Sequence, residues 1–163
     1  MPTLTFETTV DAPRQRVFDL ARSVDCHTDG MASHDERAVA GTTTGLLAEG
    51  DRVTWHARHF GVPLRLTVAV SELDRPRRFV DEQVSGPFAR LRHEHRFETI
   101  GDGNRTRMHD CFAFQSPAGP VGAAVDAVVL ERYMRRLVRS RLDHLARVAE
   151  SEEWRRYLPD GDR

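Results

Sequence analysis

The stretch RRFVDEQVSGPFARLRHEHRFETIGDGNRTRMHDCFAFQ, residues 77–115, decides the fold of this chain. It contains three runs, 77–85, 90–100 and 105–115, in which side chains of different character alternate with the period of a β-strand. The segments between the runs are rich in glycine, proline, aspartate and asparagine, which are turn residues. Short turns join antiparallel strands, whereas parallel strands need long crossovers. The stretch therefore predicts three strands of an antiparallel meander.

The same pattern extends toward the N-terminus. Two more strands are predicted over 51–60 and 63–74, and a first strand over 3–10, where apolar residues alternate with polar ones. A short amphipathic helix is predicted over 14–24, because its apolar residues recur at helical spacing. Residues 25–50 follow neither period, so we expect a loop-rich segment there.

Beyond the meander the period changes from two to that of a helix. From 121 to about 153 the chain has no proline and only one glycine, which predicts a long C-terminal helix. One face of this helix is apolar and consists of Leu130, Met134, Leu137, Val138, Leu145 and Val148. The chain is therefore expected to be an α+β protein, in which an antiparallel sheet of six to seven strands packs on this helix.

Length and charge limit the possible classes of function. A chain of 163 residues is the size of one domain, expected over 1–155 with a polar tail over 156–163. The net charge of −1 and the absence of a polybasic run argue against a nucleic-acid partner. No apolar run approaches the roughly 20 residues that cross a bilayer, and the start lacks a signal-peptide pattern, so we expect a cytoplasmic protein without membrane insertion. Cys26 and Cys111 are expected to be free thiols.

Two segments resemble a known group of proteins. They are Val10–Pro13 followed by Val17-Phe18-Asp19, and residues 78–88 leading into His93-Glu94-His95-Arg96-Phe97. With the order of elements above, the chain resembles the SRPBCC superfamily, which includes START domains and polyketide cyclase/dehydrase-like proteins. The resemblance implies a helix-grip fold, a curved sheet wrapped around the C-terminal helix with a cavity for a hydrophobic ligand between them. It transfers no catalytic motif, because the superfamily contains carriers, sensors and enzymes.

Strand 90–100 places two histidines on one face. His93 and His95 share this face with Leu91 and Phe97, where an imidazole can hydrogen-bond a ligand oxygen or exchange a proton. The alternative is that both histidines only make structural hydrogen bonds. An inward-facing Asp81 would be costly to bury without a partner, and these histidines are the natural partners. His93, His95 and Asp81 are therefore the candidate catalytic residues.

Further residues are expected to line the cavity because they share faces with the residues above or with the apolar stripe of the last helix. They are Phe79, Gln83, Leu91, Phe97, Met108, Asp110, Phe112, His59 and Arg141. Arg141 falls within the apolar stripe, where a charge needs a reason. It could reach solvent, pair with a carboxylate such as Asp81, or meet an anionic ligand group.

The two histidines and an aspartate also permit a metal site, but an H-x-H pattern on a strand is weak by itself, and we assign no metal and no cofactor from the sequence. The favoured function is the binding of an apolar or aromatic small molecule, as a carrier or sensor, by a monomer or homodimer. The alternative is a cyclase/dehydrase-type enzyme that uses the pocket His and Asp groups. A third is a subunit that stabilises a partner protein. A hydrolase or nucleotide-binding protein is disfavoured because the corresponding motifs are missing.

Overall fold

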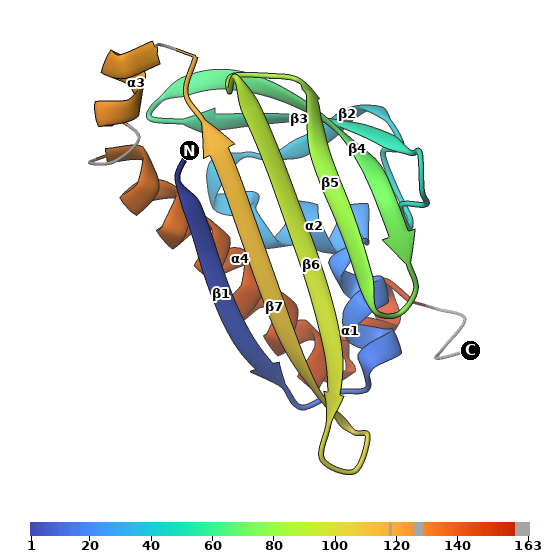
Figure 1. Ribbon diagram of the computed structural model, residues 1–163. Coiled ribbons are helices and arrows are strands. Elements are labelled where there is room, and N and C mark those ends of the chain that lie inside the picture. Colours follow the sequence, from blue (N-terminus) through green and yellow to red (C-terminus); the bar gives the residue numbers. More distant parts are fainter. Residues whose placement is uncertain (118, 126–128, 159–163) are drawn as a thin grey trace.

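The computed structural model describes residues 1–117, 119–125 and 129–158 (Figure 1). In chain order the elements are β1 (Thr3–Val10), α1 (Arg14–Ala21), α2 (Val24–Gly30), β2 (Arg37–Gly41), β3 (Arg52–His59), β4 (Val62–Asp74), β5 (Arg78–Ser85), β6 (Arg90–Ile100), β7 (Arg105–Gln115), α3 (Gly119–Val125) and α4 (Glu131–Glu150), with 3₁₀ helices at Ala32–His34 and Glu152–Arg156. The five strands predicted over 51–115 correspond to β3 to β7, with ends that agree within about two residues.

One seven-stranded antiparallel sheet organises the fold. Its strand order is β1-β7-β6-β5-β4-β3-β2, so β2 to β7 form a continuous meander and β1 closes against β7. Register shifts interrupt the β2–β3 and β4–β5 pairings, and such bulges bend a strand and increase its twist. The sheet curves around α4, which crosses its concave side (Figure 1). The α+β helix-grip prediction is confirmed.

Helix α4 buries the apolar face that the sequence predicts. Its buried side chains are Met134, Val138, Leu142, Leu145, Val148 and Ala149. At the end of the sheet that carries the β6–β7 turn, α1 covers the core with Phe18, which is fully buried. The Phe18 ring stands edge-on to Phe79 and Phe97, with centroids 5.5 and 5.2 Å away. Between the sheet and the helices, this end is a packed core, and the remaining space lies toward the other end.

The structure differs from the prediction over 25–50. Instead of a loop-rich segment, this region contains α2, a 3₁₀ helix and the edge strand β2. Helix α2 begins where the Ser23 hydroxyl accepts a hydrogen bond from the Cys26 amide at 3.2 Å, an N-cap that satisfies a free helix donor. The helix then packs against α4. The segment is thus ordered by capping and tertiary contacts, which leave no periodic signature in the sequence.

The C-terminal region also differs in detail. The stretch predicted as one helix over 121–153 contains α3 and α4 in its described part, and residues 126–128 lie outside the described residues. Trp154 is buried in the core, and so is Leu158, which means that at least this residue of the expected polar tail packs against the domain. The rest of that tail, 159–163, is outside the described residues.

Two smaller expectations can be compared directly. Cys26 and Cys111 are both free cysteines, as expected. Among the described helices, none combines the length and apolar character needed to cross a lipid bilayer.

Candidate ligand-binding site

A cavity of about 320 Å³ lies between the concave face of the sheet and the helices. Most of its wall is apolar because β3 to β7 direct alternate side chains inward and α4 contributes one face of its apolar stripe. Representative wall residues are Trp55, Val68, Val70 and Phe112 from the sheet and Met134, Leu137 and Val138 from α4. The interior therefore offers a binding site in which apolar contacts dominate and a few polar groups set orientation.

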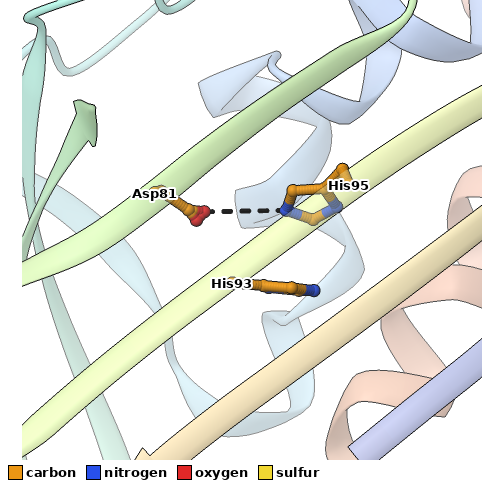
Figure 2. A group of neighbouring side chains, drawn as sticks. All are labelled: Asp81, His93 and His95. Atoms are coloured by element: carbon orange, nitrogen blue, oxygen red, sulfur yellow. Dashed lines mark ion pairs between the residues drawn. The ribbon is translucent and has the colours of Figure 1, made fainter. Parts of the chain in front are cut away.

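The first polar group of the cavity region is formed by β5, β6 and β7. Asp81 and His93 reach the cavity wall, while His95 and Asp110 lie behind them, buried. His95 Nδ1 is 2.6 Å from Asp110 Oδ1, and His95 Nε2 is 3.6 Å from Asp81 Oδ2. His93 Nε2 lies 3.2 Å from the same Asp110 oxygen. Figure 2 shows Asp81 and His95 reaching toward each other from two adjacent strands, with the His93 ring beside them.

The strand register explains why these side chains meet. Asp81 is opposite His93 in the β5–β6 pairing, and His95 is opposite Asp110 in the β6–β7 pairing. Directly opposed side chains of an antiparallel pair lie on the same face and within contact distance. The predicted Asp–His contacts are present, and the two histidine rings lie 3.8 Å apart between centroids.

Burial and the neighbouring charges shift the pKa values of this group in opposite directions. Burial, with the positive charge of His95, lowers the pKa of His93 to about 4. Burial alone would lower the pKa of His95, but the carboxylates of Asp110 and Asp81 raise it above its usual value. Burial would raise the pKa of Asp81, but the neighbouring imidazole of His95 lowers it to about 2. His95 is therefore favoured in its protonated form between two carboxylates, while His93 is neutral at the cavity wall.

A second polar group lies on the α2 and β2 side of the cavity, and of its residues only His59 is among the predicted site residues. His27 of α2 forms a short hydrogen bond with Glu36, and its ring stacks on Trp55 at 4.1 Å between centroids. Burial lowers the pKa of His27 below its usual value although Glu36 opposes the shift. Nearby, the Tyr133 hydroxyl of α4 lies 2.6 Å from His59 Nδ1. His27 and Glu36 were not predicted, because their segment was expected to be a loop.

Arg141 of α4 is half-buried and lines the cavity. Within the described part of the chain, no carboxylate lies within 4.0 Å of its guanidinium, so the direct pair with Asp81, one of the three readings left open by the sequence, is absent. Its positive charge still acts at longer range, since it contributes to lowering the pKa values of Asp81 and Glu36. Arg141 is therefore available to a polar group of a ligand.

The predicted site residues fall into two groups, according to where along their strands they lie: some line the cavity and others do not. Those that line the cavity are Phe79, Asp81, Leu91, His93, Phe112, His59 and Arg141. Phe97, Met108, Asp110 and His95 face the same side but lie outside the cavity lining, buried in the core or behind the wall. Gln83 does not line it either: its side-chain amide donates to the Phe88 carbonyl at 2.7 Å and so holds the β5–β6 turn that carries Phe88 to the wall.

Comparison with protein families identifies this arrangement. A family model described as polyketide cyclase/dehydrase and lipid transport matches residues 1–150. The chain belongs to this family. Membership confirms the resemblance to the SRPBCC superfamily, and it covers all of the strands and α4. No curated protein matches the chain.

Solved structures show that the cyclase/dehydrase and lipid-transport fold spans the whole chain. ZhuI aromatase/cyclase from Streptomyces sp. R1128 is similar with a TM-score of 0.74 and 19% identity, covering 99% of both chains. The protein TTHA0849 from Thermus thermophilus gives 0.72 and 20%, covering 98% of this chain and 99% of the other. A START superfamily protein from Mycobacterium smegmatis gives 0.61 and 11%, covering 91% and 94%. At these identities the likeness shows the fold alone.

Proposed function

We propose that the protein binds a hydrophobic or aromatic small molecule, lipid- or polyketide-like, in the cavity between sheet and α4, as a carrier or sensor. The observation that carries this proposal is the cavity itself, about 320 Å³ with mainly apolar walls. This volume is at the lower end of the range typical of small-molecule sites, roughly 300–1,000 Å³. A compact ligand of a few rings or a short chain fits better than a long lipid.

The polar groups would set the orientation of this ligand. His93 and Asp81 present polar atoms on the β5–β6 wall, and Arg141 presents a guanidinium from α4. The His59–Tyr133 pair and Glu36 add polar atoms on the β2–β3 side. A ligand with an apolar body and two separated oxygen functions would match this distribution, because each function could find a polar partner while the body stays in contact with carbon.

A second candidate function is a cyclase- or dehydrase-type enzyme. The family description supports it, as does the position of His93 and Asp81, which reach the wall side by side. In this reading the pocket histidine and aspartate act on an oxygen function of the bound molecule, and the cavity walls hold the chain in a folded shape.

Extraction of the purified protein with organic solvent, followed by mass spectrometry, tests the binding proposal. We expect a co-purifying hydrophobic compound, or uptake of one from a lysate extract of the native host, at up to one molecule per chain. The same compound recovered with unchanged mass after incubation supports a carrier or sensor. A changed mass that the His93→Ala variant no longer produces, although it still retains the compound, supports the enzyme. Absence of any saturable uptake contradicts both.

A further inference from the structure

We propose that Asp81, His93 and His95 bind a divalent transition-metal ion on the wall of the cavity, with Asp110 as the carboxylate that orients both histidines. The inference goes beyond the binding of an organic ligand and does not depend on it.

The donor atoms of the three side chains are close enough together to approach one ion. One ligand atom from each of Asp81, His93 and His95 can be chosen so that all three lie within 4.8 Å of one another. The distance of 3.6 Å between His95 Nε2 and Asp81 Oδ2 is too long for a good hydrogen bond. It is close to the roughly 3.4 Å that separates two donors bound about 2.1 Å from one tetrahedral ion. The three side chains lie beside one another on one face of β5 and β6 (Figure 2).

His95 is buried, and its ring nitrogens lack hydrogen bonds. The side chain is 1% exposed, and within the described residues neither Nδ1 nor Nε2 meets hydrogen-bond geometry, although each lies at ion-pair distance from a carboxylate. A buried polar atom normally has a partner, because leaving it unpaired costs about 1–3 kcal/mol. Here the Nε2 atom points toward Asp81, from which it lies at ion-pair distance but without a hydrogen bond.

Asp110 lies behind both histidines, where it can orient their rings. Its Oδ1 atom is 2.6 Å from His95 Nδ1 and 3.2 Å from His93 Nε2. If these two nitrogens carry hydrogens toward Asp110, the opposite ring nitrogens are left as electron-pair donors. A carboxylate behind a histidine ligand is the usual outer partner in metal sites, where it fixes the tautomer and the orientation of the ring.

The negative charge of the two carboxylates also favours a cation at this site. Asp81 and Asp110 bring two carboxylates to a buried wall, and among the described residues neither has an arginine within 4.0 Å. Their only close partners in that part of the chain are His93 and His95. A divalent cation held by neutral histidines would balance both carboxylates, so ion binding would replace the protons that the cluster otherwise needs.

The donor set indicates the class of ion. Two imidazoles and one carboxylate suit Zn²⁺ or Fe²⁺ and leave at least one coordination position open. Because Asp81 and His93 reach the cavity, the open position would face a bound ligand. An ion there would polarise a carbonyl or enol oxygen of that ligand.

Calorimetric titration of the chelator-treated protein with Zn²⁺, and with Fe²⁺ under anaerobic conditions, tests the proposal. We expect one ion per chain with micromolar or tighter affinity. Asp81→Asn and His93→Gln should each weaken binding at least 100-fold. His109→Gln is the matched control, because His109 also lies beside carboxylates, Glu7 and Glu98, but on the outer face of the sheet. It should bind like the wild type.

Thermal unfolding with and without Zn²⁺ guards against variants that merely misfold. The ion should raise the Tm of the wild type and of His109→Gln, because it binds only the folded state, and should leave Asp81→Asn unchanged. Asp81 is the safest site to alter, since its side chain is 17% exposed and the amide keeps its size. The metal site is overturned if the wild type fails to bind at 1:1 stoichiometry, or if Asp81→Asn and His93→Gln bind the ion as tightly as the wild type does. Either result leaves the organic-ligand proposal intact.

Discussion

Replacing Phe18 by alanine should lower the free energy of unfolding by about 3–5 kcal/mol, the range observed for removing a fully buried phenylalanine. The ring is fully buried and contacts Phe79 and Phe97, so it fastens α1 to β5 and β6. Its removal leaves a cavity that the surrounding strands can fill only in part, because their positions are fixed by the sheet ladder. Urea unfolding followed by circular dichroism measures the change.

Phe60→Ala is the matched control for this prediction. Phe60 is 65% exposed and contacts Tyr133 at the cavity wall, with ring centroids 4.3 Å apart. We expect it to cost less than about 1 kcal/mol, because little apolar surface leaves contact with protein. A loss in Phe18→Ala no larger than the roughly 1 kcal/mol limit expected for Phe60→Ala would contradict the prediction.

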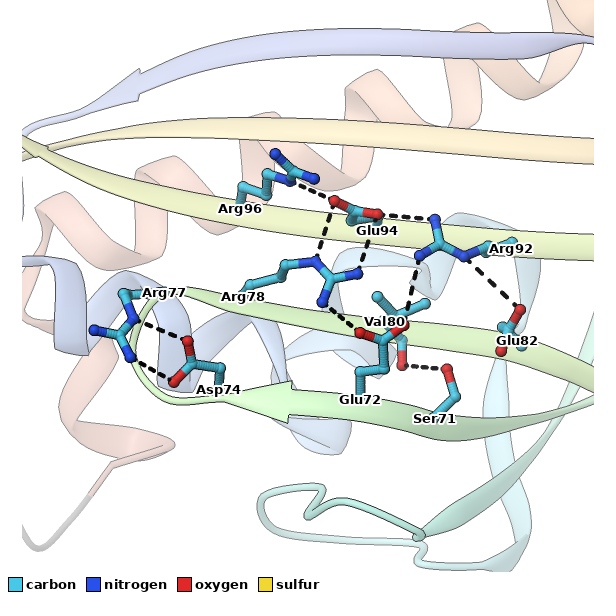
Figure 3. Close-up of polar contacts among 10 residues, drawn as sticks. All are labelled: Ser71, Glu72, Asp74, Arg77, Arg78, Val80, Glu82, Arg92, Glu94 and Arg96. Atoms are coloured by element: carbon cyan, nitrogen blue, oxygen red, sulfur yellow. Dashed lines mark hydrogen bonds and ion pairs between the residues drawn. The ribbon is translucent and has the colours of Figure 1, made fainter.

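Replacing Glu94 by glutamine should cost about 2–3 kcal/mol. Glu94 lies on the convex face of the sheet but is only 8% exposed, because it is covered by Arg78, Arg92 and Arg96 (Figure 3). Burial would raise the pKa of Glu94, but hydrogen bonds from the three arginines lower it to about 2. The amide removes the negative charge from the centre of the three guanidiniums, which then repel one another with less compensation. Chemical denaturation at neutral pH measures the loss.

Glu82→Gln provides the comparison on the same face. Glu82 is half-exposed, and Arg92 approaches it only to 3.8 Å. An exposed ion pair of this kind contributes about 0–1 kcal/mol, so the variant should unfold within about 0.5 kcal/mol of the wild type. If the glutamine variants at 82 and 94 lose the same stability, the arginine cluster around Glu94 is not cooperative.

The sequence predicts the sheet well because two signals agree there. Alternation identifies the strands, and glycine- and proline-rich turns mark where they end, so β3 to β7 appear close to their predicted bounds. The long apolar stripe of α4 is equally clear, because a period of 3.6 over five turns cannot be mistaken for a strand.

The face on which a strand residue lies is easier to predict than whether that residue lines the cavity or belongs to the packed core. Period two places Leu91, His93, His95 and Phe97 on one face, and all four are indeed buried. Only the first two line the cavity, because α1 inserts Phe18 against the end of the strand that carries Phe97. Where one helix stops covering a sheet is a tertiary property, which no local pattern encodes.

The His27–Glu36 pair was missed for a related reason. Helix α2, VDCHTDG, is too short to show amphipathic spacing and contains a terminal glycine, so its sequence reads as a loop. His27 meets Glu36 nine residues later only because α2 and the start of β2 fold against each other. A histidine and a glutamate in a polar segment carry no signal of that contact before the fold is known.

A fluorescence titration with a hydrophobic probe, such as an anilinonaphthalene dye, tests whether the cavity holds an organic ligand. It compares the wild type with two alanine-to-phenylalanine variants. Ala57 lines the cavity from β3, so Ala57→Phe should occupy its space and weaken probe binding at least tenfold while the protein stays folded. Ala40 is exposed on β2, so Ala40→Phe should bind like the wild type. Saturable 1:1 binding lost only in Ala57→Phe supports the account; no saturable binding by the wild type, or equal binding by all three proteins, would contradict it.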